Sequence, residues 1–209
     1  MRRFVTALLL AGLGAAVGIA EVESWLPPPV AEGVAQQLDG RLRRIGDGAA
    51  PANALELSRQ AVDALRAELE DWGVDGIVER APDLTRLGVP RAESPLLDAM
   101  ARYQVCNMAL MLTFEEPANA DDAELRRRAS VGLTAVTMAI LRLREPFHVA
   151  GGDDAAIESF LTRAEMEPVL QKLQADAEIR RQTERSCDPI VTPLIAEPLR
   201  RLGAPAPQP

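Results

Sequence analysis

Two cysteines, Cys106 and Cys187, are the residues of this 209-residue sequence with the most obvious potential for chemistry. A cysteine nucleophile needs a nearby base and an electropositive, partly exposed setting, whereas Cys106 lies in the uncharged stretch YQVCNMALML. In an oxidising compartment two cysteines without a third candidate usually pair. We therefore predict a Cys106–Cys187 disulfide. In the chain-entropy model, closing this loop stabilises the folded state by about 4–5 kcal/mol at most. Two free, inert thiols and a catalytic Cys106 are the alternatives.

Two amide side chains flank Cys106, and they have two interpretations. Gln104 and Asn107 are three positions apart and would share a face of a helix. A buried amide needs partners, because an unsatisfied one costs about 1–3 kcal/mol. The first interpretation is a polar network with hydroxyl groups on a second uncharged helix, at Ser130, Thr134 and Thr137. The alternative is a small ligand pocket between helices, lined by Tyr103, Gln104, Asn107 and Met111.

The single histidine, His148, is the candidate for acid–base chemistry. It follows Pro146 and precedes Gly151 and Gly152, so we predict a loop position. There it could act as a base with a carboxylate or as a pH sensor, although a surface histidine without such a role is more common. The paired carboxylates, at positions 115–116, 121–122 and 153–154, stand at predicted helix ends, and capping explains the two aspartate pairs. We predict no catalytic residue.

The sequence also predicts no metal site and no cofactor. One histidine cannot supply a zinc or copper(II) site of ordinary composition. Methionine and cysteine sulfur can hold copper(I), but methionines at core spacing in an apolar helix usually fill the core. The methionines with that spacing are Met100, Met108, Met111 and Met138.

Helical periodicity recurs along the chain, and strand signals are missing. The spacing predicts helices over about 30–45, 53–72, 94–114, 121–143, 153–161 and 167–179, with a short one over 193–202. Residues 74–93 contain several glycines and prolines and are predicted to form a long, partly irregular connection. A helix end is predicted before Cys187, because Pro189 follows it.

Two of the predicted helices carry uncharged stretches, at 103–114 and 129–141. A helix that is apolar on all sides must be buried on all sides, and these stretches are too short to cross a membrane. We therefore predict an all-α, single-domain bundle of about six or seven helices around a buried antiparallel helical hairpin. Gly132, Ala135 and Ala139 would let a neighbouring helix approach the hairpin closely.

The N-terminal sequence, MRRFVTALLLAGLGAAVGIA, has the layout of a secretory signal peptide that is cleaved before Glu21. An uncleaved N-terminal anchor is the alternative. The predicted organisation is a signal peptide or anchor at 1–20, a proline-rich spacer at 21–29, the helical domain at 30–203 and a disordered tail at 204–209.

The charge balance limits the partners. The net charge of −8 repels nucleic acid and anionic lipid at long range, and basic clusters such as Arg126–Arg128 are interpreted as solvated helix faces. We expect a soluble, periplasmic or secreted protein that binds an envelope protein or a small ligand, touches no nucleic acid and has no catalytic activity. The alternatives are an accessory subunit tethered to the membrane by its N-terminal segment, and an enzyme using His148.

Overall fold

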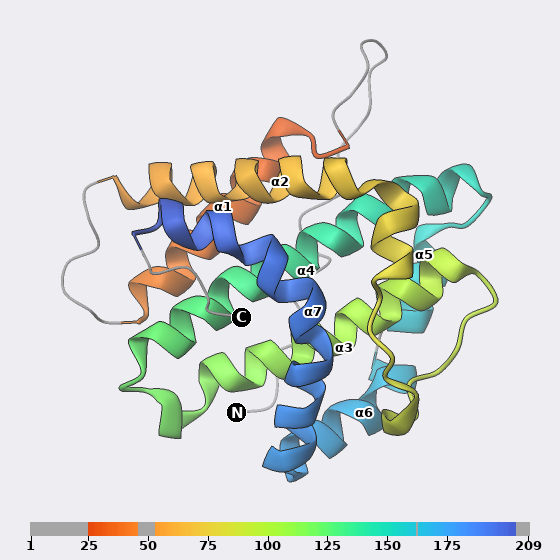
Figure 1. Ribbon diagram of the computed structural model, residues 1–209. Helices are drawn as coiled ribbons and strands as arrows, with labels where there is room; N and C mark the ends of the chain where they lie inside the picture. Colours follow the sequence, from red (N-terminus) through yellow and green to blue (C-terminus); the bar gives the residue numbers. More distant parts are fainter. Residues whose placement is uncertain (1–24, 46–52, 162, 204–209) are drawn as a thin grey trace.

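Helices make up the regular structure of residues 25–45, 53–161 and 163–203, the part of the chain that the computed structural model describes (Figure 1). They are α1 (Pro28–Arg43), α2 (Ala54–Glu79), α3 (Pro95–Glu115), α4 (Ala123–Val149), α5 (Asp154–Leu161), α6 (Arg163–Ala175) and α7 (Ala177–Arg201), with two 3-10 turns, η1 (Thr85–Leu87) and η2 (Pro117–Asn119). The predicted all-α single-domain bundle is confirmed. The predicted signal peptide or anchor and the predicted tail lie outside the described residues.

Helices α3 and α4 form the predicted antiparallel hairpin at the centre of the bundle (Figure 1). The Ser94 hydroxyl accepts a hydrogen bond from the Leu97 amide and caps α3, and Pro95 occupies the first turn. The Asp122 carboxylate accepts from the Leu125 amide at 2.9 Å and caps α4. Residues 129–136 of α4 are all buried, so the uncharged stretch lies in the core as its composition predicts.

Helix α7 crosses the hairpin and packs on both of its helices (Figure 1). Gly132 makes this contact close: a Cβ atom there would lie 3.1 Å from Val191 Cγ1 on α7 and 3.2 Å from Leu110 Cδ1 on α3. The predicted close approach at Gly132 is therefore present. Helices α1 and α2 also pack on α4 and complete the main core.

The predicted disulfide joins Cys106 of α3 to Cys187 of α7, with 6.0 Å between the two Cα atoms. The two half-cystines are 0% and 1% exposed, and they belong to the main core cluster. They are 81 positions apart in the sequence, so the bond fixes the C-terminal helix onto the central hairpin.

The prediction that a helix ends before Cys187 is wrong, because α7 is continuous through Pro189, Pro193 and Pro198. Each proline removes one helical hydrogen bond. The buried side chains of α7 compensate by holding the helix against the core, and they include Ile190, Val191, Leu194, Ile195 and Leu199. The actual break lies at Asp176, whose carboxylate caps α7 by accepting from the amides of Glu178 and Ile179.

Three further boundaries differ from the prediction. Helix α1 begins at Pro28, two residues before the predicted start. Helix α2 continues to Glu79 beyond a kink at Gly73, whose φ of 64° and ψ of 174° suit glycine almost alone, and Figure 1 shows the end of α2 turning away from its axis. Helix α4 continues through Pro146 to Val149, so His148 lies in its last turn and not in a loop.

The end of α4 shows why the proline is tolerated. Phe147 is 6% exposed and anchors the last turn in the core. The chain then leaves the helix through Gly151 at a φ of 91°, where the Gly151 amide donates to the His148 carbonyl and the Gly152 amide to the Phe147 carbonyl, both at 2.9 Å. This pair of bonds is a Schellman motif.

Candidate functional site

The four residues of the predicted ligand pocket lie along one side of α3 but differ in burial. Tyr103 and Asn107 are one helical turn apart and are buried, at 0% and 5% exposure. Gln104 and Met111 are two turns apart and are half-buried. Helical geometry places all four residues within about 100° around the axis, with Tyr103 at one edge of this range and Gln104 at the other. One edge of this range is therefore packed in the core, and the other edge, with Gln104 and Met111, is partly accessible.

The Tyr103 hydroxyl has a structural partner. It donates a hydrogen bond to the Ile77 carbonyl at 2.8 Å, in the last turn of α2. That carbonyl needs such a donor, because the Ala81 amide bonds to the Val78 carbonyl instead. Burial raises the pKa of Tyr103, so the hydroxyl stays protonated at neutral pH. Tyr103 thus caps the kinked end of α2 against the central hairpin.

We expect Tyr103→Phe to lower the free energy of unfolding by about 1 kcal/mol, because it leaves the buried Ile77 carbonyl without its donor. Urea denaturation measures the change. Ser186→Ala is the control: the exposed Ser186 hydroxyl also donates to a carbonyl, that of Gln182, and its removal should cost less than about 0.5 kcal/mol. Equal losses in the two variants would contradict the capping role.

Asn107 takes part in a polar network between α3 and α4, the first of the two interpretations of the sequence. Its Nδ2 donates to Thr137 Oγ1 at 3.0 Å, and Thr137 Oγ1 donates to the Leu133 carbonyl at 2.7 Å. The Asn107 amide therefore joins α3 to α4 through the Thr137 hydroxyl, which donates its own proton to the Leu133 carbonyl. Ser130 and Thr134, the other predicted hydroxyl partners, are not bonded to Asn107; Thr134 Oγ1 donates to the Ser130 carbonyl at 3.0 Å.

Gln104 belongs to a half-buried row of α3 side chains. The row also contains Met108, Met111 and Leu112, which stand one or two turns along the helix from Gln104. Met108 and Leu112 pack at the edge of one satellite core cluster, and Met111 packs at the edge of another. The Gln104 side chain makes no hydrogen bond within the described part of the chain. Ligand binding by the four residues stays a prediction, and the geometry leaves Gln104 and Met111 as its accessible half.

His148 forms the histidine–carboxylate pair that an acid–base role would need. Its Nε2 lies 3.0 Å from Asp154 Oδ1, and its Nδ1 lies 3.1 Å from the Gly152 carbonyl oxygen. Arg144 also binds Asp154 Oδ1, at 2.7 Å from Nη2 and 3.0 Å from Nε. The Arg144 guanidinium holds the pKa of Asp154 below its ordinary value. An anionic Asp154 thus ties the end of α4 to the start of α5.

Glu184 on α7 is a partly buried carboxyl group that the sequence interpretation did not single out. The Thr113 hydroxyl of α3 donates to its Oε1, close to an ion pair of 2.6 Å between Arg180 and Glu116 that joins the same two helices. Burial raises the pKa of Glu184 despite the Thr113 bond and the nearby Arg180. No pattern in the sequence marks this pair, because its members are 71 positions apart.

The raised pKa of Glu184 predicts a stability that depends on pH. The folded state holds this proton more tightly than the unfolded state, so the stability contribution is complete below the ordinary glutamate pKa and is lost as pH rises through the folded value. We expect Glu184→Gln, which keeps an acceptor for Thr113, to raise the urea midpoint at pH 7 and to match the wild type near pH 4. The exposed Glu158→Gln is the control; the same pH-dependent gain there would contradict the assignment.

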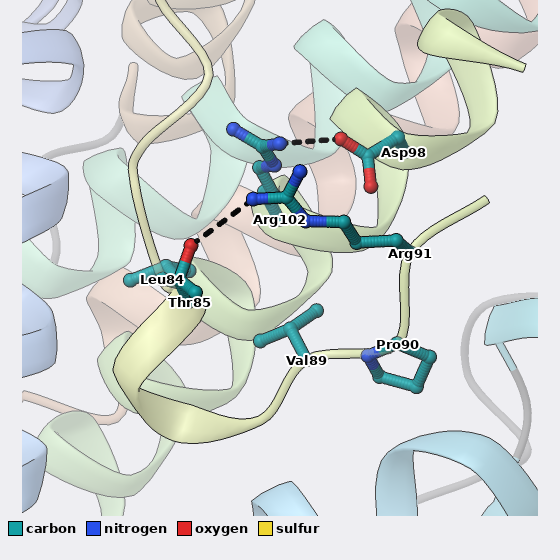
Figure 2. Close-up of a pocket in the computed structure, with 7 residues that line it drawn as sticks. All are labelled: Leu84, Thr85, Val89, Pro90, Arg91, Asp98 and Arg102. Atoms are coloured by element: carbon teal, nitrogen blue, oxygen red, sulfur yellow. Dashed lines mark hydrogen bonds and ion pairs between the residues drawn. The ribbon is translucent and has the colours of Figure 1, made fainter. Parts of the chain in front are cut away.

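A shallow hollow lies where η1 and the segment after it pack against the start of α3 (Figure 2). Its volume is about 210 Å3, part of which is open to solvent, and its lining includes Leu84, Thr85, Val89, Pro90 and Arg91. Arg102 Nη2 binds Asp98 Oδ2 at 2.5 Å on one side, as the four-residue spacing predicts. Arg91 Nη2 lies 3.4 Å from Thr85 Oγ1 on the other. None of the predicted site residues lines this hollow.

The described part of the chain contains no group of three or more His, Cys, Asp or Glu side chains arranged to hold a metal ion. None of its helices combines the length and apolar character needed to cross a membrane. Comparison of the chain with protein-family models, with curated proteins and with solved structures found no match.

Proposed function

We propose that this chain is an exported helical module that binds a partner in the cell envelope and has no catalytic role. The buried Cys106–Cys187 disulfide is the observation that supports the proposal most directly. Structural disulfides persist in oxidising compartments such as the periplasm and the extracellular space. The N-terminal sequence pattern of residues 1–20 agrees with export.

The partner in this proposal is a protein, and its contact residues are Gln104 and Met111. Tyr103 and Asn107 already have intramolecular partners, which leaves the half-buried row of α3 as the accessible part of the predicted site. Methionine side chains adapt to different apolar surfaces, and the Gln104 amide offers both donors and an acceptor. A row of half-buried side chains along a helix is better suited to contact the surface of another protein than to enclose a small molecule.

Intact-mass measurement of the protein purified from its native envelope tests export. A chain that begins at Glu21 supports cleavage and release, whereas a chain that begins at Met1 supports the alternative of an accessory subunit tethered by its N-terminal segment. Alkylation with and without prior reduction tests the compartment. The native protein should gain the mass of two alkyl groups only after reduction, and free thiols in the native sample would contradict an oxidising location.

Photo-crosslinking in the native envelope tests the contact residues. A photoreactive amino acid placed at position 104 or 111 should give one crosslinked protein of the same mass, and the same amino acid at the exposed Gln171 of α6 should not. Gln104→Arg should then reduce the yield of the crosslink from position 111. Crosslinks of equal yield from all three positions, or from position 171 alone, would contradict the proposed contact.

The 3.0 Å contact between His148 Nε2 and Asp154 favours one second candidate, hydrolysis with His148 as general base. This role requires Nδ1 to leave the Gly152 carbonyl oxygen, 3.1 Å away, because both ring nitrogens face oxygen atoms in the structure. The test is hydrolysis of activated acetate and phosphate esters by the wild type and by His148→Ala. Activity that disappears in the variant supports this candidate. Activity that is the same in both proteins, or missing from both, rejects it for these substrate classes.

A further inference from the structure

Three arginine side chains gather around the C-terminal end of α1. Arg41 Nη2 donates to Thr134 Oγ1 at 2.6 Å and lies 3.4 Å from the Ser130 carbonyl oxygen of α4. Arg44 lies close enough for its charge to lower the pKa of Arg41 further, although burial is the larger cause. Arg126, in the first turns of α4, donates to the Arg44 carbonyl at 3.1 Å. The three guanidinium groups thus come from the last turn of α1, from the residue that follows it, and from α4.

The ring of Phe114, at the end of α3, supports two of these groups. The guanidinium carbon of Arg44 lies 5.2 Å from the ring centroid, and that of Arg126 lies 4.9 Å from it. Such distances are typical of cation–π contacts. Phe114 is 3% exposed, and Arg126 Nη1 also donates to the Ala120 carbonyl at 3.3 Å. The two cations are therefore held near one another by a buried ring and by backbone oxygens, none of which carries a charge.

No carboxylate of the described residues lies within ion-pair distance of Arg41, Arg44 or Arg126, whereas most other arginines in that part of the chain have one. Two acidic residues near them in the described sequence, Asp39 and Asp122, are engaged elsewhere. Asp39 binds Arg43 at 2.7 Å, and Asp122 caps α4. Arg41 is the member of the cluster for which burial matters most, whereas Arg44 is exposed. A charge withdrawn from solvent without a counter-charge is costly, so among the described residues Arg41 lacks an anion.

Unsatisfied polar atoms mark the same place independently of the charges. The Nε atoms of Arg41 and Arg126 and the hydroxyl oxygen of Ser130 are buried and have no hydrogen-bond partner among the described residues. Ser130 is 0% exposed, and its carbonyl is already contacted by Arg41. Burial lowers the pKa of Arg41 to about 10, so this guanidinium remains charged at neutral pH. Positive charge and unused donors therefore occur together at the junction of α1 and α4.

From these contacts we propose that Arg41, Arg44 and Arg126 form a binding site for a small oxyanion of the phosphate type. Guanidinium groups match the geometry of phosphate oxygens, and each can donate two parallel hydrogen bonds. The oxyanion comes either from free phosphate or from the phosphate of a lipid headgroup. The net charge of −8 disfavours an anionic lipid surface, so we expect free phosphate to bind better. This site does not depend on export or on a protein partner.

Thermal unfolding of the whole mature protein in inorganic phosphate tests the site. Phosphate at 20 mM should raise the unfolding temperature by about 2 °C or more over sodium chloride of equal ionic strength. Arg44→Gln should weaken the apparent affinity for phosphate about tenfold. Arg43→Gln is the matched control, because it removes the same charge one position away from a side chain that already binds Asp39, and it should keep the full response.

Each outcome has a defined meaning. A phosphate response that Arg44→Gln loses and Arg43→Gln keeps supports the site. Equal loss in the two variants overturns it, because the effect is then general electrostatic attraction. Co-sedimentation with phosphatidylglycerol vesicles, with phosphatidylcholine vesicles as the control, distinguishes a lipid headgroup from free phosphate as the source of the oxyanion. Binding to the anionic vesicles that requires Arg44, without a response to free phosphate, assigns the site to a lipid headgroup, and no response in either arm overturns the proposal.

Discussion

Replacement of both Cys106 and Cys187 by alanine is expected to lower the free energy of unfolding by about 3–5 kcal/mol. The disulfide joins positions that are 81 residues apart, so its removal restores a large amount of chain entropy to the unfolded state. The two buried sulfur atoms also leave the core, where they contact the main cluster. Urea denaturation of the mature protein under non-reducing conditions measures the loss.

Reduction provides the control for this prediction. Dithiothreitol should destabilise the wild type by a similar amount once the protein has been unfolded and refolded in its presence, and it should not affect the double variant. A double variant within about 1 kcal/mol of the wild type would show that the packing of α7 on the hairpin holds without the bond. In that case the entropy calculation would overstate the contribution of this loop.

Gly132→Leu is expected to have the second largest effect, a loss of about 1–3 kcal/mol from overpacking. Even a Cβ atom at position 132 would lie 3.1 Å from Val191 Cγ1 and 3.2 Å from Leu110 Cδ1. The remaining atoms of a leucine side chain would have to separate α4 from α3 and α7. Thermal unfolding and urea denaturation both report this change.

Gly40→Leu is the matched control for the Gly132 prediction. Gly40 also lies inside a helix, α1, but nothing lies within 4 Å of a Cβ atom built there. Leucine has a helix propensity about 0.8 kcal/mol better than that of glycine, so the control should be neutral or stabilising. A loss of the same size in both variants would mean that leucine is unfavourable for a reason unrelated to the contact between α4 and α7.

The fold could be predicted to a large extent because its strongest signals are local. The uncharged stretches at 103–114 and 129–141 require burial wherever they lie, and in the structure they form the two halves of the central hairpin. The pairing of Cys106 with Cys187 followed from the cysteine count, since no other pairing within the chain exists. These conclusions need composition and periodicity but no knowledge of distant contacts.

Helix boundaries near prolines were decided by tertiary packing. The sequence around Pro146, and around Pro189 to Pro193, predicts breaks, because proline removes a helical hydrogen bond. In the structure α4 and α7 continue through these residues, because Phe147 and the buried side chains of α7 pack in the main core. The burial of several apolar side chains outweighs the hydrogen bond lost at each proline, and this balance cannot be calculated from the local sequence.

The sequence by itself determined that α3 carries a charge-free segment with a cysteine, two amides and a tyrosine. Only the tertiary structure decided which of these side chains have partners: Tyr103 reaches Ile77, Asn107 reaches Thr137, and Gln104 remains half-buried. The arginine cluster around Arg41 and Arg126 likewise required the fold, because helices distant in sequence bring these charges together. Spacing along a helix reveals which residues share a face, but the neighbouring helices determine what that face contacts.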